Sequence, residues 1–206
     1  MAPTSEVPLW FAELLHQELD RWVALTQGQI GQLYQHYELL VRWNQRMNLT
    51  TVRPGPEMVI RHYCESLFFG VHLPASHNDI SVLDLGSGAG FPGVPLAVQK
   101  PSWQVILVEA SQRKAVFLRE STRHLHNVRV LAERLENLAE TADWAVARAV
   151  EPLLILSNIP RLAPNVGLML TERDFSLVHT KSHIAWEDPV RLPWGDRKIC
   201  VFGCST

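Results

Sequence analysis

The sequence predicts an α/β fold in which a doubly wound, mostly parallel β-sheet carries a small helical cap on its N-terminal side. Residues 9–70 repeat apolar side chains at helical spacing, whereas from residue 80 short apolar runs alternate with helical stretches. Five of these runs lie about 20–25 residues apart, the spacing of β-α-β units that build a parallel sheet. We therefore expect a helical cap at 1–75 and a sheet domain at 76–206, together forming one compact unit.

The N-terminal elements are expected to be helices. In QIGQLYQHYELLVRWNQ (29–45), apolar residues fall at i, i+3, i+4, i+7, i+10 and i+11, which places them in one stripe. Segment 9–25 follows the same pattern less regularly. RPGP (53–56) must interrupt any helix, because proline lacks the backbone donor, and EMVIRHYCESLFFG (57–70) indicates the next helix, ending at Gly70.

The expected strands follow in chain order. They are SVLDLG (81–86), QVILVEA (104–110), VRVLAE (128–133), WAVARAV (144–150), VGLMLTE (166–172) and KICVFGC (198–204). The last run follows RLPWGDR closely, so we expect a β-hairpin at that end of the sheet.

Composition and charge restrict the class of protein. With 206 residues, 47% of them hydrophobic, the chain can bury a full core. A formal net charge of −2 provides no strong positive field, so any contact with nucleic acid must be a local patch. Three cysteines without a CxxC pair indicate a reducing compartment, and neither a secretory signal nor a membrane-spanning run is found. We expect a cytoplasmic protein with no membrane partner.

A glycine-rich loop, VLDLGSGAGFPG (82–93), follows the first expected strand. In a doubly wound sheet, ligands bind beyond the carboxyl ends of the strands. Gly86, Gly88 and Gly90 can adopt positive φ and let a ligand rest on backbone amides. A dinucleotide site would carry GxGxxG, but Phe91 occupies the third glycine position, which disfavours a nicotinamide cofactor.

The loop instead follows the pattern Asp-x-Gly-x-Gly-x-Gly from Asp84 to Gly90, the form associated with enzymes that use S-adenosylmethionine (SAM). Glu109 ends the next expected strand, nineteen residues after Gly90. A carboxylate there can accept hydrogen bonds from both ribose hydroxyls. The preceding strand, the following helix and this acid together favour a SAM site over a structural turn.

Six stretches resemble one family, in order along the chain. They are RWNQRMNLTTV (42–52), VIRHYCESL (59–67), DLGSGAGFPGVPLAV (84–98), RKAVFLRE (113–120), VARAV (146–150) and GDRKICVF (195–202). From about residue 28 onward the chain resembles the bacterial 16S ribosomal RNA guanine-N7 methyltransferases, formerly called glucose-inhibited division protein B. The resemblance implies a Rossmann-like SAM-dependent methyltransferase domain at 76–206 and methylation of guanine N7 in the 530 loop of 16S rRNA, within the 30S ribosomal subunit.

The resemblance also implies a SAM pocket. It places Leu135 and Glu136 near the adenine and Glu109 at the ribose, where relatives often carry aspartate. For Leu135, ordinary core packing is an equal alternative. The full expected cofactor-binding set is Asp84, Gly86, Gly88, Gly90, Phe91, Glu109, Leu135, Glu136 and Arg148.

One departure from the family concerns the segment after the fifth strand. Family members commonly carry Leu-Lys-Gly there, and this chain has Glu172, Arg173 and Asp174. Arg173 keeps the positive charge, but arginine is bulkier and planar, and the lost glycine can change the path of the loop.

Methylation at N7 needs little catalytic machinery, because N7 carries an in-plane lone pair and no proton. The task is alignment without a general base, and Asn48, Arg148 and Arg173 are expected to position the substrate. For Asn48, a turn or helix-cap role is an equal alternative. No metal is expected, and the histidines with a conceivable role are expected to be surface or core residues, namely His62, His124 and His126.

Basic residues are expected to contact RNA, although a solvated charged surface is the alternative for each. The candidates are Arg53, Arg61, Arg113, Lys114, Arg123 and Arg197. Such a patch would bind RNA weakly and with strong salt dependence, so recognition can require a whole ribosomal particle. Three other functions stay open: a methyltransferase of the same fold acting on a protein or small molecule, a non-catalytic RNA-binding or assembly protein, and a nicotinamide-dependent oxidoreductase.

Overall fold

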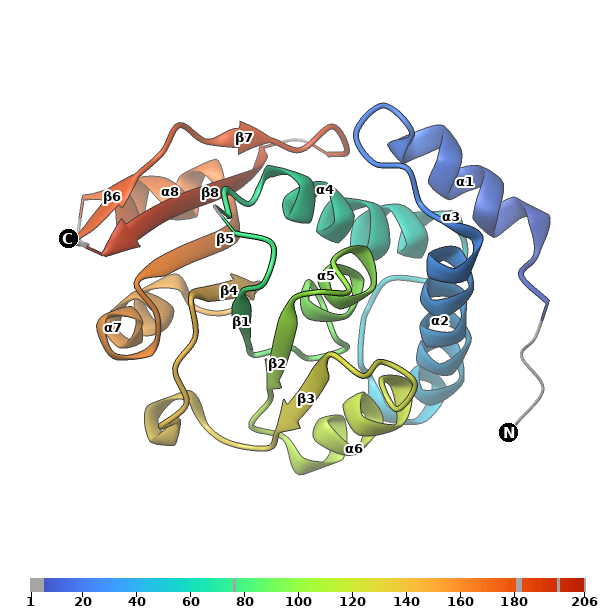
Figure 1. Cartoon of the computed structure of the whole chain (residues 1–206), viewed down its shortest axis with the longest axis horizontal. Coiled ribbons are helices and arrows are strands. Elements are labelled where there is room, and N and C mark those ends of the chain that lie inside the picture. Colours follow the sequence, from blue (N-terminus) through green and yellow to red (C-terminus); the bar gives the residue numbers. More distant parts are fainter. Residues whose placement is uncertain (1–5, 76, 181–182, 196, 206) are drawn as a thin grey trace.

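The computed structural model describes residues 6–75, 77–180, 183–195 and 197–205 and confirms the predicted fold class (Figure 1). Within these ranges an eight-stranded sheet runs in the order β3-β2-β1-β4-β5-β8-β6, and β7 pairs with β8. Neighbouring strands from β1 to β5 are parallel. β8 runs antiparallel to β5, and β6 and β7 run antiparallel to β8.

All six predicted strands are present. The parallel ones are β1 (Ser81–Leu85), β2 (Gln104–Val108), β3 (Val128–Leu131), β4 (Trp144–Arg148) and β5 (Asn165–Thr171). The sixth predicted strand is β8 (Lys198–Ser205), and the sheet also contains β6 (Ile184–Trp186) and β7 (Val190–Arg191). The expected hairpin is formed by β7 and β8, where the Leu192 amide donates to the Lys198 carbonyl at 3.1 Å. The sequence did not predict β6, because three residues are too few to show a period.

Helices connect the strands and precede them. They are α1 (Leu9–Leu19), α2 (Gln27–Met47), α3 (Pro56–Met58), the π-helical segment η1 (Val59–Cys64), α4 (Glu65–His72), α5 (Gly93–Gln99), α6 (Gln112–Ser121), the 3₁₀ turn η2 (Leu135–Asn137), α7 (Pro152–Leu162) and α8 (Glu172–His179). The first helix ends at Leu19 rather than residue 25, and a capping box formed by Thr26 and Gln29 then starts α2. The break at 53–56 occurs as predicted, with Pro56 as the first residue of α3.

The helices cover both faces of the sheet. One hydrophobic cluster joins α1, α2, α4, α5 and α6 to one face, and a second joins α7 and α8 to the other (Figure 1). The N-terminal helices share their core with the sheet, since Phe69 of α4 packs against Phe202 of β8 at 5.1 Å between ring centroids. The division into a cap at 1–75 and a domain at 76–206 stays a prediction. Within the described ranges, no helix combines the length and apolar character needed to cross a membrane.

Candidate functional site

The loop after β1 is a tight backbone turn held by the end of β2. Gly86, Gly88 and Gly90 have φ of +73°, +57° and +92°, as the sequence predicted. The Gly86 and Ser87 amides both donate to the Val108 carbonyl, at 2.9 and 3.0 Å. These hydrogen bonds attach the loop to the carboxyl edge of the sheet.

The three glycines differ in what surrounds them. A Cβ added at Gly86 would lie 2.6 Å from Val150 Cγ2, and one at Gly90 would lie 2.7 Å from Val94 Cγ2. A Cβ added at Gly88 would meet nothing closer than the Gly86 carbonyl at 3.8 Å. Protein atoms close off Gly86 and Gly90, whereas the space at Gly88 is open to a ligand.

The Glu109 carboxylate ties this loop to the start of α6. Its Oε2 accepts a hydrogen bond from the Gly88 amide at 2.9 Å, and its Oε1 accepts one from the Ser111 amide at 2.8 Å. The residue is only 8% exposed. Each carboxylate oxygen keeps a second lone pair, so Glu109 can both shape the loop and accept a further donor.

Asp84, at the end of β1, is fully buried beneath the loop. Its Oδ2 accepts from the Gly93 amide at 3.0 Å, while its Oδ1 is buried and has no partner among the described residues. Burial raises the pKa of the Asp84 carboxyl to about 7. An unpartnered buried acceptor is costly, so this oxygen suits a bound donor or cation.

Phe91 lies in an aromatic cluster behind the loop. Its ring stacks on His62 with centroids 4.7 Å apart and meets Tyr63 edge-on at 5.1 Å. Thr50 Oγ1 and His62 Nε2 are hydrogen-bonded at 2.8 Å. Burial, with a smaller effect of the Arg148 charge, lowers the pKa of His62 to about 3. His62 is therefore a neutral, partly buried histidine, and contact of Phe91 with a cofactor stays a prediction.

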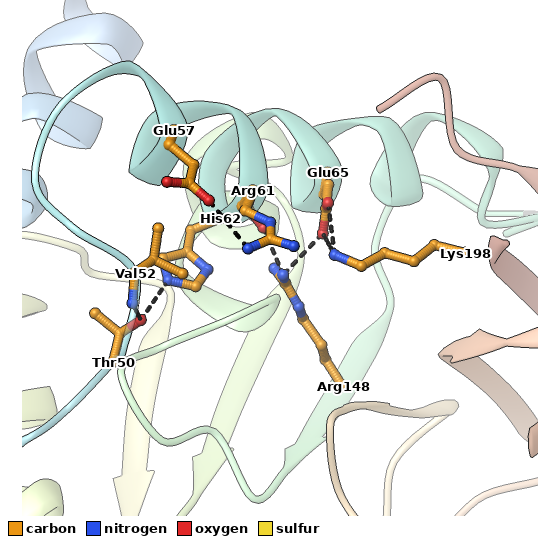
Figure 2. A network of polar contacts seen from close by, with 8 residues as sticks. All are labelled: Thr50, Val52, Glu57, Arg61, His62, Glu65, Arg148 and Lys198. Atoms are coloured by element: carbon orange, nitrogen blue, oxygen red, sulfur yellow. Dashed lines mark hydrogen bonds and ion pairs between the residues drawn. The ribbon is translucent and has the colours of Figure 1, made fainter. Parts of the chain in front are cut away.

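A buried ion-pair network joins three elements beside the loop (Figure 2). Glu65 on α4 is 1% exposed and accepts from Arg148 Nη2 at 2.8 Å and from Lys198 Nζ at 2.9 and 3.2 Å. Arg148 Nη2 also donates to the Arg61 carbonyl. Arg148 Nη1 is buried without a partner among the described residues. Two cations thus share one carboxylate, and one guanidinium donor stays available.

Sequence reasoning identified Arg148 but missed Glu65 and Lys198. Glu65 is an acid within the apolar run of a helix, and Lys198 begins the last strand. An acid at such a position was a signal for a buried partner, because a lone buried carboxylate is rarely stable.

A cavity of about 470 Å³ adjoins this network at the carboxyl ends of β4 and β5. It is lined by Glu65, Arg148, Ala149, Val150, Glu151, Pro152, Met169, Leu170, Thr171, Asp174, Leu192, Lys198 and Ile199. Charged groups therefore meet apolar walls in one hollow, the composition typical of a site for a planar polar ligand.

The departure at 172–174 forms the start of α8 rather than a loop. Thr171 Oγ1 accepts from the Asp174 amide at 3.1 Å and donates to Asp174 Oδ2 at 2.7 Å, which caps the helix. Asp174 lines the cavity, whereas Arg173 is exposed and does not. A substrate role for Arg173 stays a prediction without structural support.

The remaining candidates lie around the site. Asn48 ends α2 as a left-handed C-cap with φ +48°, so it has the cap role considered from the sequence, and it is exposed. In η2, Leu135 packs against the second core cluster and Glu136 is exposed. The exposed or partly exposed basic candidates are Arg53, Arg61, Arg113, Lys114, Arg123 and Arg197. Of these, Arg61 pairs with Glu57 at 3.1 Å and Arg123 lies 4.0 Å from Glu120.

Together, these residues can hold a ligand that carries both positive charge and hydroxyl donors. Asp84 and Glu109 supply carboxylate oxygens and Gly88 supplies open space, and Val150, which approaches Gly86, lines the separate cavity at β4 and β5. Across the described ranges, no three histidine, cysteine, aspartate or glutamate side chains are grouped to hold a metal ion.

The family profile and the relatives similar in sequence carry the same family description. The family profile described as rRNA small subunit methyltransferase G (GidB) matches residues 29–172. The chain is 46% identical to Ribosomal RNA small subunit methyltransferase G of Xanthomonas axonopodis pv. citri over 125 residues, 59% of this chain and 57% of that protein. The Xanthomonas campestris pv. campestris protein of the same name is 44% identical over 169 residues, 80% of this chain and 74% of that protein. The first match thus spans a little over half of its relative's length.

Comparison with solved structures supports the fold. The fibrillarin/Nop5p complex gives a TM-score of 0.60 at 18% identity, over 75% of this chain and 87% of that chain. A SAM-dependent methyltransferase from Aquifex aeolicus gives 0.58 at 17% identity, over 74% and 94%. Aeropyrum pernix fibrillarin in complex with S-adenosyl-L-methionine gives 0.54 at 16% identity, over 68% and 73%. At these identities the likeness concerns the fold alone.

Proposed function

The chain belongs to the rRNA small subunit methyltransferase G family, and from that premise we propose that it transfers a methyl group from SAM to guanine N7 in the 530 loop of 16S rRNA. One observation carries the proposal beyond family membership. Two residues before the open space at Gly88, a Cβ at Gly86 would lie 2.6 Å from Val150, and Val150 lines the cavity that Arg148 also lines. A cofactor and an acceptor base can therefore occupy neighbouring sites. The partner would be the 30S subunit, and the location the cytoplasm.

The residues at the loop fit SAM. SAM carries a cationic amino group, a sulfonium and a ribose diol, and when bound it supplies the methyl group. The Asp84 carboxylate, buried beneath the loop, places negative charge near the proposed cationic ligand, and the free lone pairs of Glu109 suit hydroxyl donors. Glycine at 88 leaves room for the ligand against the backbone. Leu135 and Glu136 remain the proposed contacts of the adenine.

The chain's own residues would align the guanine and exclude water. Guanine presents two acceptors on its major-groove edge, N7 and O6. The free Nη1 donor of Arg148 could bind O6 and leave the N7 lone pair unhydrated, while Glu65 fixes the guanidinium. Because N7 carries no proton, no side chain has to remove one, and the rate gain comes from orientation.

The proposal is tested by incubating the protein with 30S subunits and SAM carrying a tritiated methyl group. We expect label in 16S rRNA and strand cleavage at a single guanine after borohydride and aniline treatment, which is specific for N7-methylguanine. Label in a ribosomal protein would favour the alternative of a same-fold enzyme with another substrate. RNA binding without label would favour a non-catalytic role, and binding of NADH instead of SAM would favour an oxidoreductase.

SAM affinity is expected to rise between pH 6 and pH 8 because of Asp84. Its raised pKa of about 7 means that the carboxyl is neutral below this range and charged above it. A cationic ligand binds the charged form more tightly, by at most about tenfold per pH unit for one proton. Isothermal titration calorimetry of the wild type and Asp84→Asn measures this, since SAM's own titration affects both proteins equally. Parallel pH profiles for the two proteins would place Asp84 away from the cofactor charge.

The methyl-transfer step at saturating SAM is expected to be independent of pH from 6 to 8.5. His62, with a pKa of about 3, is neutral throughout this range and too weak a base to assist. His124→Gln and His126→Gln should stay within about tenfold of the wild type, or about 1.4 kcal/mol of barrier. Single-turnover methylation of 30S subunits checks this. A rise in rate that one histidine substitution removes would mean a general base, with an exocyclic amine or a protein nucleophile as the target.

A further inference from the structure

A groove runs between α2 and α6 on the helical side of the molecule. Two adjoining hollows of about 480 and 450 Å³ form it, and they share Arg42, Trp43 and Val116. The remaining lining residues are Leu39, Gln45, Arg46, Met47, Arg113, Arg119, Glu120 and Arg123. We call this surface the α2–α6 groove.

The groove concentrates positive charge on a protein that is otherwise slightly acidic. Five arginines line it, and all five are exposed, namely Arg42, Arg46, Arg113, Arg119 and Arg123. Of these five, only Arg123 has an ion-pair partner within 4.0 Å in the described part of the chain, namely Glu120. The formal net charge of the whole chain is −2, so this cluster is a local field and not a general property of the surface.

The floor of the groove is apolar and aromatic. Trp43 is partly exposed, and its ring lies 5.7 Å from that of Phe117, which anchors it in the core. Val116 is 51% exposed and lines both hollows. A fixed indole surrounded by guanidinium groups is the arrangement on which unpaired bases stack while arginines hold the phosphates.

We propose that the α2–α6 groove binds a single-stranded stretch of RNA adjoining the target guanine. The inference rests on the proposed function and adds a second RNA contact outside the cavity that receives the base. The chain leads from the groove toward the site, since Met47 lines the groove, Asn48 then ends α2, and Thr50 hydrogen-bonds His62, which stacks on Phe91 of the loop. The phosphates of a duplex could contact the arginines, but its bases could not contact Trp43, because paired bases cannot stack on a side chain.

The test measures fluorescence anisotropy of a labelled single-stranded RNA of about 12 nucleotides, a typical site size. The test variant is Arg42→Gln, Arg46→Gln and Arg113→Gln combined. Its control combines Arg21→Gln, Arg129→Gln and Arg191→Gln, which removes the same charge from other surfaces, where Arg21 stacks on Trp22 and the other two pair with glutamates. We expect an affinity loss of tenfold or more only in the test variant. Its slope of log affinity against log salt should fall by about 2, at about 0.7 per lost phosphate contact.

A second variant tests the apolar floor without risk to the fold. Val116→Glu places a carboxylate on an exposed position and should weaken the same RNA by about tenfold while leaving SAM affinity unchanged. Equal losses in the test and control variants, or equal affinity for a duplex of the same length, would overturn the proposal. Binding of an acidic peptide, polyglutamate, to the groove without any binding of the RNA would also overturn the proposal. That result would assign the surface to an acidic protein.

The readouts separate this inference from the proposed function. If the groove variants lose RNA affinity but the wild type transfers no methyl group to 30S subunits, the groove stands and the proposed function fails. If methyl transfer occurs and the groove variants bind RNA as the wild type does, the proposed function stands and the groove proposal fails.

Discussion

Gly88→Val is expected to lower SAM affinity by more than about a hundredfold, or about 2.8 kcal/mol, in a protein that still folds. The added Cβ meets no protein atom closer than 3.8 Å, so the side chain would fill the space proposed for the ligand. The left-handed backbone at φ +57° adds strain of about 1–2 kcal/mol, which a stable domain tolerates. Calorimetry of SAM binding and the thermal midpoint of unfolding would be measured together.

Two other glycines serve as controls. Gly195→Val, in the hairpin before β8, carries comparable strain at φ +100° with no atom within 4 Å, and should bind SAM like the wild type. Gly86→Val brings its Cβ to 2.6 Å from Val150, so it should lower the unfolding midpoint as well as affinity. Near-normal SAM affinity in a folded Gly88→Val protein would remove this loop from the cofactor site.

Arg148→Ala is expected to reduce single-turnover methyl transfer by more than about a hundredfold and to destabilise the fold. Breaking a buried ion pair costs about 3–5 kcal/mol, and the lower end applies here because Lys198 still pairs with Glu65. The loss in transfer reflects a guanine that is no longer oriented. Methylation of 30S subunits at saturating SAM and urea unfolding would measure the two effects.

A double variant separates the two roles of Arg148. Combining Glu65→Gln with Arg148→Met removes both buried charges, so most of the stability should return while transfer stays low. A surface control is Arg191→Ala, whose partner is Glu172 at 2.6 Å and whose side chain is 78% exposed; it should cost less than about 1 kcal/mol. Normal transfer by folded Arg148→Ala would mean that Arg148 acts only in stability.

Much of the fold could be predicted because its signals are local. Strands of four or more residues showed apolar runs, and the helices of the N-terminal part showed a 3.6-residue period. The short strand β6 has no such signal. The weak apolar pattern of 9–25 concealed both the end of α1 at Leu19 and the capping box at Thr26 that starts α2.

The candidate site was predictable only where its residues are close in sequence. The glycine loop and the acid at the end of the next strand follow from chain order, and their positions agree with the expectation. The network around Glu65 joins residues 83 and 133 positions apart, a pairing that no local pattern encodes. The role of Asp174 depended on a helix start at Thr171, which the comparison with Leu-Lys-Gly did not suggest.

The position of β8 has a consequence for the order of biosynthesis. Translation produces β8 after every other strand of the described sheet, yet β8 lies between β5 and β6. Until residue 198 and those after it leave the ribosome, β5 has an unpaired edge and Glu65 lacks one of its two cations. A nascent chain can therefore fold its parallel strands early, but the Glu65 network is complete only once β8 has been made. An enzyme proposed to modify ribosomes would thus acquire its finished site only after a ribosome has made β8.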